Sequence, residues 1–132
     1  MIGMTIPAGI TRDHIDGFEL YRGAVNEDKT PGCVVLVHVD TENRDVAQKW
    51  VDAVFHAIET DPELPREEGV SAHFHIREDG RHVINYAEWV SEEGHIAALE
   101  AAGPGVGSDT PEWRRVQNFP GVTPAGFERY RV

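Results

Sequence analysis

The chain has 132 residues, a length that fits a single domain. It carries 23 Asp and Glu residues against 12 Lys and Arg residues, which gives a net charge of −11 with histidine neutral. Because this charge repels phosphate backbones and anionic lipid, we expect no nucleic acid and no membrane surface as a partner. The longest purely apolar run, Cys33 to Val37, is too short to span a bilayer, and no targeting signal is visible. The sequence therefore predicts a cytoplasmic protein.

Glycine and proline interrupt residues 1–32, where only residues 18–25 have the pattern of a short strand. We expect this segment to be an arm or leader that is partly ordered at best. The domain itself is then predicted over residues 33–132. The single cysteine, Cys33, opens its first strand, and we interpret it as buried packing because no cationic setting for a reactive thiolate is visible.

A Val-rich strand is predicted over residues 33–39, followed by a helix from Thr41, its candidate cap, to Thr60. Apolar residues recur along this helix at steps of three or four and form one stripe. The stripe consists of Val46, Trp50, Val51, Val54, Phe55 and Ile58.

A hairpin is predicted from strands over residues 69–76 and 82–90, joined at Asp79-Gly80, a dipeptide typical of a type I′ turn. The turn fixes the register of the two strands. It sets Ile76 opposite Val83, Phe74 opposite Asn85, Ala72 opposite Ala87 and Val70 opposite Trp89.

Strict alternation then places Asn85 and Trp89 on one largely apolar face of the hairpin. The other face is polar and aromatic, and it includes His73, His75, Tyr86 and Glu88.

A second helix is predicted from its cap Ser91 to Ala102, and a flexible cover over Gly103 to Ser108. A short helix then starts at Thr110-Pro111, and a last strand covers residues 127–132. The resulting order is the βαββαβ pattern of an α+β, ferredoxin-like domain with a four-stranded antiparallel sheet and helices on one face. Because the other face also needs cover, we expect a homodimer.

The run from Gly69 to Glu93 resembles the hairpin of antibiotic biosynthesis monooxygenase (ABM) domains, which are dimeric α/β-barrel proteins. The resemblance covers residues 33–132, and its most specific part is Asn-Tyr-Ala-Glu-Trp-Val-Ser at residues 85–91. The spacing of Asn85 and Trp89 is similar to that of a residue pair in cofactor-independent anthrone oxygenases of aromatic-polyketide pathways. The resemblance implies a monooxygenase that uses O₂ and no cofactor on a polycyclic phenolic or anthrone-type substrate.

In this interpretation Asn85 and Trp89 hold and polarise a substrate oxygen. Some members of the family have a tyrosine early in the following helix, where this sequence has His95, whose reference pKa near neutrality suits a proton acceptor. The candidate substrate-binding residues are Phe74, Tyr86, Arg114 and Arg115.

Several alternatives remain open from the residues alone. The same donors and base would serve a polyketide cyclase or isomerase, and the domain could also be a dimeric binding module without activity. A haem-binding relative would depend on His95. His73, His75 and Glu88 could form a two-histidine, one-carboxylate iron site, but we favour polar packing for them and predict no metal.

Overall fold

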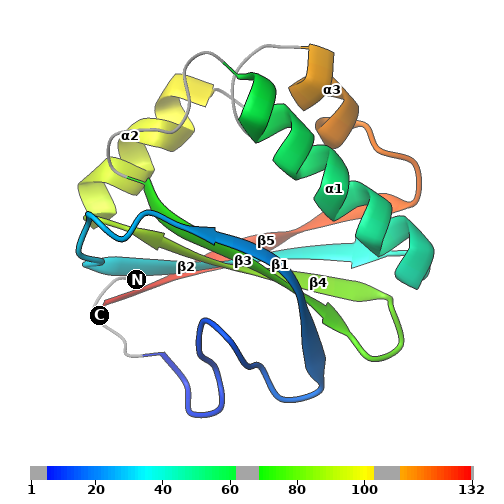
Figure 1. Ribbon diagram of the computed structural model, residues 1–132, viewed down its shortest axis with the longest axis horizontal. Helices are drawn as coiled ribbons and strands as arrows, with labels where there is room; N and C mark the ends of the chain where they lie inside the picture. Colours follow the sequence, from blue (N-terminus) through cyan, green and yellow to red (C-terminus); the bar gives the residue numbers. More distant parts are fainter. Residues whose placement is uncertain (1–5, 62–68, 103–110, 132) are drawn as a thin grey trace.

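The computed structural model describes residues 6–61, 69–102 and 111–131, and within them one antiparallel sheet has the strand order β1-β3-β4-β2-β5. The strands are β1 (Phe18–Val25), β2 (Cys33–Thr41), β3 (Gly69–Arg77), β4 (His82–Trp89) and β5 (Val122–Arg131). The helices are α1 (Arg44–Thr60), α2 (Glu92–Ala102) and α3 (Pro111–Gln117), and Figure 1 shows them on one face of the sheet.

From β2 onward the element order and the strand order β3-β4-β2-β5 are those of a ferredoxin-like domain. The predicted α+β fold with helices on one face is therefore confirmed. The sheet has five described strands instead of the expected four, because β1 pairs antiparallel with β3 at the edge of the sheet.

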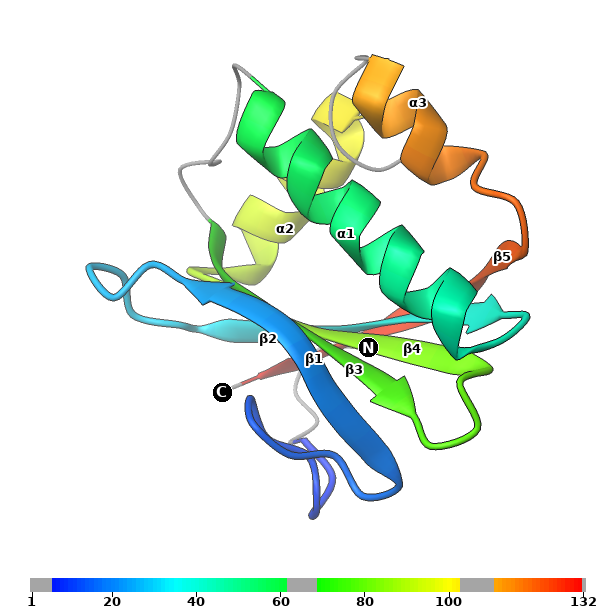
Figure 2. The ribbon, with the colours of Figure 1, turned by 45° about the vertical axis from the view of Figure 1, so that its right-hand side comes forward.

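The N-terminal segment, residues 6–17, packs on the face of the sheet that the helices leave free, as Figure 2 shows. Ile15 is 4% exposed there. This second core cluster consists of Ile15, Val34, Leu36, Ile84, Tyr86 and Tyr130, with Ile6, Ile10 and Phe18 packed against it. The described residues of the segment that we expected to be a partly ordered arm or leader thus bury apolar side chains against the sheet. The domain boundary at residue 32 stays a prediction.

The main core lies between α1 and the sheet, and the predicted helical stripe supplies much of it. Trp50, Val51, Val54 and Phe55 are all buried. The cap is Asn43 instead of Thr41: the Asn43 Oδ1 accepts a hydrogen bond from the Val46 backbone N at 2.9 Å. Thr41 instead ends β2, where its hydroxyl donates to the Gly80 carbonyl at 2.7 Å.

The hairpin register is confirmed at its centre and differs at its open end. Phe74 faces Asn85 as predicted. Trp89, however, pairs with Gly69 instead of Val70, because a β-bulge between Gly69 and Ser71 adds one residue to β3.

The turn of the hairpin also differs from its prediction. Gly80 has φ 73°, but no non-glycine residue in the described ranges has a positive φ. A type I′ turn needs two positive φ angles, so the connection is instead a four-residue loop over residues 78–81. It contains a turn closed by a hydrogen bond from Gly80 N to the Arg77 carbonyl at 2.8 Å.

The remaining elements follow the sequence more closely. Ser91 caps α2, since its Oγ accepts a hydrogen bond from Gly94 N at 3.0 Å. Cys33 is fully buried, and burial raises the pKa of its thiol, which fits the interpretation of Cys33 as a packing residue.

The last strand begins at Val122 instead of residue 127. The cover predicted over Gly103 to Ser108 and the cap Thr110 lie outside the described residues. Across the described ranges, every helix falls short of the length and apolarity that a membrane crossing requires.

Candidate functional site

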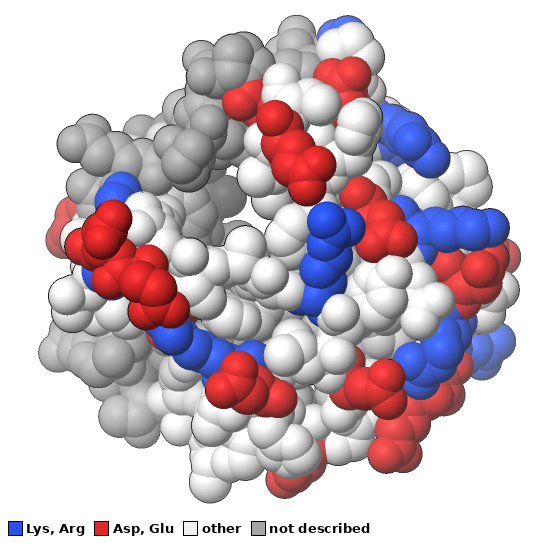
Figure 3. Space-filling model, in the orientation of Figure 1, with Lys and Arg blue, Asp and Glu red and all other residues white. Residues whose placement is uncertain are grey.

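The helices leave part of their face of the sheet open beside α2. Val37 lies on β2, an interior strand, yet it is only half-buried. Its neighbours in the same row are Asn85 on β4, also half-buried, and Phe127 on β5, which is 46% exposed. Figure 3 shows the surface hollowed between α2 and α1, above the sheet. We call this opening the α2 cleft.

Asn85 lies on the helix-covered face of the sheet and presents a hydrogen-bond donor. Its Oδ1 accepts a hydrogen bond from the His73 backbone N at 3.1 Å. Because the carbonyl end of the amide must face that N–H, Nδ2 is turned away from it. Nδ2 has no partner in the described part of the chain, so it can donate to a ligand.

Three aromatic rings meet at the start of α2. Trp89 ends β4, and its ring centroid is 5.3 Å from that of His95. The His95 ring in turn meets the ring of Phe127 edge to face, with 5.5 Å between centroids. The cap at Ser91 sets this arrangement, because the first turn of α2 then carries His95 back over β4 and β5. The result is a histidine held between two aromatic rings.

His95 is 5% exposed, and its Nδ1 is buried without a hydrogen-bond partner in the described residues. Burial, and then the positive charge of Arg129, lower the pKa of His95 from 6.5 to about 4. The imidazole is therefore neutral at pH 7 and able to accept a proton. An unpartnered buried nitrogen is unfavourable, so a ligand in the cleft would be a natural partner.

Arg129 stands two residues after Phe127 on β5 and therefore on the same face of the sheet. Its guanidinium carbon is 5.6 Å from the centroid of the Phe127 ring. Its Nε is 4.0 Å from Oε1 of Glu92, in the first turn of α2. The cleft thus combines aromatic rings, a neutral imidazole, a free amide donor and one guanidinium.

Two of the predicted substrate-binding residues lie elsewhere. Phe74 is 3% exposed in the main core, with its ring against those of Trp50 and Phe55. Tyr86 lies in the second core cluster on the opposite face of the sheet, since neighbouring residues of a strand alternate in direction. Tyr86 therefore cannot share a site with Asn85.

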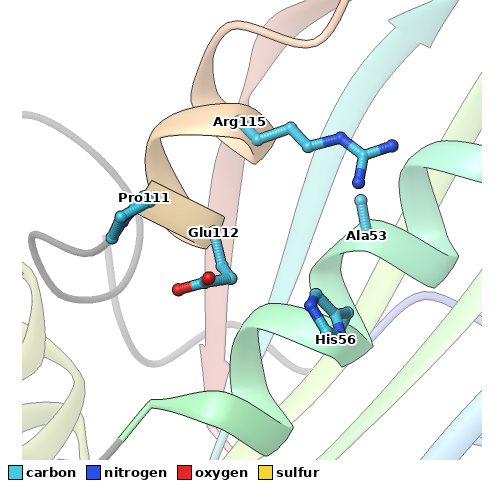
Figure 4. A pocket seen from close by; sticks show the side chains of 5 residues that line it. All are labelled: Ala53, His56, Pro111, Glu112 and Arg115. Atoms are coloured by element: carbon cyan, nitrogen blue, oxygen red, sulfur yellow. The ribbon is translucent and has the colours of Figure 1, made fainter.

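The two arginines of α3 are also separate from the cleft. Arg114 is exposed on α3. Arg115 lines a groove of about 240 Å³ between α1 and α3, which Figure 4 shows together with its other lining residues, Ala53, His56, Pro111 and Glu112. None of Asn85, Trp89 and His95 lines this groove. The structure brings Trp89 and His95 into contact and places Asn85 on the same face of β4, whereas Phe74, Tyr86 and Arg115 lie elsewhere and Arg114 is exposed.

Phe127 and Arg129 were not among the candidates from the sequence. They come from a strand that is far from Asn85 along the chain, and they reach the cleft because β5 pairs with β2. The signal that could have identified them is the ferredoxin-like order, in which the last strand lies beside the first strand of the fold.

The alternative of an iron site at His73, His75 and Glu88 is not supported. In the described ranges, no group of three or more His, Cys, Asp or Glu residues could hold a metal ion. His75 Nε2 lies 2.9 Å from the Arg12 carbonyl, and Oε1 of Glu88 accepts hydrogen bonds from Arg12 and from Ser71, both at 2.7 Å. The N-terminal segment thus contacts two of the three candidate ligands, His75 and Glu88.

No family model and no curated protein matches the sequence. Among solved structures, the chain is similar to the monooxygenase from the gene ActVA-Orf6 of Streptomyces coelicolor in complex with nanaomycin D, with 21% identity and a TM-score of 0.47 over 75% of this chain and 83% of that chain. It is also similar to a putative monooxygenase of Fusobacterium nucleatum subsp. nucleatum, with 7% identity and a TM-score of 0.49 over 85% of this chain and 48% of that chain. The chain thus spans about half the length of the second protein. At these identities and TM-scores the fold assignment rests on the strand order above.

Proposed function

We propose that this protein is a cofactor-independent monooxygenase for a polycyclic phenolic or anthrone-type substrate of antibiotic or secondary-metabolite biosynthesis. The observation that carries the proposal is His95: a buried, neutral imidazole with an unpartnered nitrogen, placed between the rings of Trp89 and Phe127. The resemblance of residues 85–91 to the ABM hairpin supports the same function.

The residues of the cleft suit the first step, removal of a proton from a ring CH₂ group that lies across the central ring from the ketone and is conjugated with it. The flat substrate would lie against Trp89 and Phe127. Asn85 Nδ2 and the indole N–H of Trp89, both without a partner in the described residues, would donate hydrogen bonds to the ketone oxygen as it becomes an enolate. His95 would accept the proton, because burial keeps it in the base form.

The second step needs no electron donor other than the substrate. The carbanion adds to O₂, and the proton held by His95 goes to the resulting peroxide, which gives a hydroperoxide. Loss of water then converts the original CH₂ group to a carbonyl. One oxygen atom enters the product and the other leaves as water, so the methylene supplies all the electrons that O₂ accepts.

We would test this proposal by measuring O₂ uptake by chelator-treated protein with dithranol or emodin anthrone, above the rate of spontaneous autoxidation. Removal of one oxyanion donor lowers turnover by roughly 10²–10³-fold in well-studied sites. We therefore expect the rate of O₂ uptake to fall by at least about tenfold in Asn85→Ala, and to fall in Trp89→Phe as well. Asn118→Ala, at the exposed end of α3, is the matched control and should keep full uptake.

Equal uptake by all the variants, or none above autoxidation, would contradict the proposal. Turnover without O₂ consumption would indicate a cyclase or isomerase, and tight binding without turnover would indicate a binding module.

A further inference from the structure

We infer that the α2 cleft binds its aromatic substrate as an anion, a phenolate or carboxylate, with Arg129 as the counter-ion. This inference rests on the proposed function and names the charge state that the substrate would have. Arg129 would be a positioning residue for the substrate, because it pairs with the anion and not with the reacting carbon.

The guanidinium of Arg129 has N–H donors that are open to a ligand. It makes no hydrogen bond to the described part of the chain, although it offers five N–H donors. Its nearest carboxylate oxygen, Oε1 of Glu92, is 4.0 Å from Nε, which is beyond hydrogen-bond distance. The two side chains are only 26% and 30% exposed, so water reaches the guanidinium only in part. A ligand oxygen could therefore take the open donors.

Arg129 is a cation near His95 in a protein whose net charge is −11. The charged groups that act on the thiol of Cys33 are Arg129 on β5 and Glu92 and Glu93 in the first turn of α2. Of these, only Arg129 has a marked effect on His95, whose pKa it lowers, whereas all three affect Cys33 beneath them. Among the charged side chains named here, Arg129 is therefore the one that acts on the imidazole, and an oxyanion bound beside His95 would be attracted to its guanidinium.

The shape of the surface indicates which kind of anion. Arg129 stands over the Phe127 ring, and the same ring meets His95 edge to face. A planar guanidinium beside a planar ring is suited to a flat ligand that carries an oxyanion in the plane of its rings. Acidic phenols and carboxylates on a fused aromatic skeleton have this shape. Such a charge near His95 would offset the effect of Arg129 and make the imidazole a better base once the substrate is bound.

The inference can be tested by equilibrium binding, separately from turnover. An anthraquinone carboxylate and its neutral carboxamide have nearly the same shape, and neither has a CH₂ group to oxidise. Calorimetric titration of the unmodified protein should show a preference for the carboxylate of about tenfold or more. Arg129→Gln should abolish that preference and leave the affinity for the carboxamide unchanged. Arg129→Lys keeps the positive charge but loses the paired N–H donors of the guanidinium, so this variant should keep part of the preference for the carboxylate.

Arg81→Gln is the control, because Arg81 is an exposed arginine next to the hairpin turn. It should keep the full preference. Equal affinity for the two ligands, or a preference that survives Arg129→Gln, would overturn the inference and leave the proposed oxygenase standing. Binding of neither ligand would overturn both, since it would remove the aromatic site itself.

Discussion

At the scale of single residues, His95 and Arg129 are coupled. From the sequence alone, a histidine in the first turns of a helix could equally be exposed to solvent or belong to a functional site. Here the aromatic rings on both sides exclude water from it, and the guanidinium next to it opposes a second positive charge. The imidazole therefore keeps its neutral form over most of the pH range in which the protein would work.

This coupling predicts the pH dependence of the site. A neutral His95 is the active base, so activity should be lost as the pH falls through its pKa of about 4. Arg129→Gln removes one cause of the low pKa, so the pKa and the acid limb of the pH–rate profile should both move upward. The measurements are an NMR titration of the His95 ring and the pH–rate profile, with Arg81→Gln as control. A His95 that titrates near 6.5 in the unmodified protein would contradict this account.

At the scale of elements, the N-terminal segment acts as a cover for the far face of the sheet. Its polar anchor is the ion pair between Arg12 and Glu88, in which the nearest nitrogen and oxygen are 2.6 Å apart and Glu88 is buried. The backbone carbonyl of Arg12 also forms a hydrogen bond with Nε2 of His75. Apolar burial and a shielded ion pair thus act at the same place, which explains why this segment packs on the sheet.

Removal of one partner should expose the role of this anchor. Arg12→Ala leaves a buried carboxylate without its cation, and we expect unfolding to become easier by about 2 kcal/mol in urea titrations. Adding Glu88→Gln to that variant removes the unpaired charge and should recover part of the loss.

The matched control for Arg12→Ala is Arg77→Ala, which breaks a fully exposed ion pair with Asp79 on the hairpin and should hardly change the unfolding midpoint. Equal effects of the two substitutions would show that the N-terminal segment is not held by this ion pair.

At the scale of the whole molecule, three buried histidines are held neutral. Burial lowers the pKa values of His73, His75 and His95 below 6.5. The unfolded chain binds protons at these positions at a higher pH than the folded chain, so stability should fall as the pH drops below 6.5. For His95 the fall extends down to about pH 4, and a shift of that size corresponds to about 3 kcal/mol.

Urea unfolding at a series of pH values between 7 and 4 would measure this loss. His95→Phe removes one of the three groups and should flatten the dependence, whereas His56→Gln, at an exposed position on α1, should leave it unchanged. A stability that does not change over this range would contradict the burial of these side chains in neutral form.

The homodimer that we propose belongs to this scale as well. The argument for it was that one face of the sheet lacks cover, and the N-terminal segment now supplies part of that cover. The area left for a second copy is therefore smaller than the sequence suggested, and the dimer stays a prediction.

The sequence by itself determined those features that depend on neighbouring residues. The stripe of α1, the cap of α2 and the central register of the hairpin follow from side-chain spacing and capping chemistry over a few residues, and the order of strands and helices then gave the ferredoxin-like class. The resemblance of residues 85–91 also indicated Asn85, Trp89 and His95 as one candidate group, which stays a prediction.

Only the tertiary structure decided what depends on contacts between distant parts of the chain. Arg12 and Glu88 are 76 residues apart, and Phe127 and Arg129 reach the α2 cleft through the pairing of β5 with β2. The bulge that shifts Trp89 is likewise a property of the paired strands. Local patterns cannot encode such contacts, because the free energy of each depends on which surfaces the finished sheet presents.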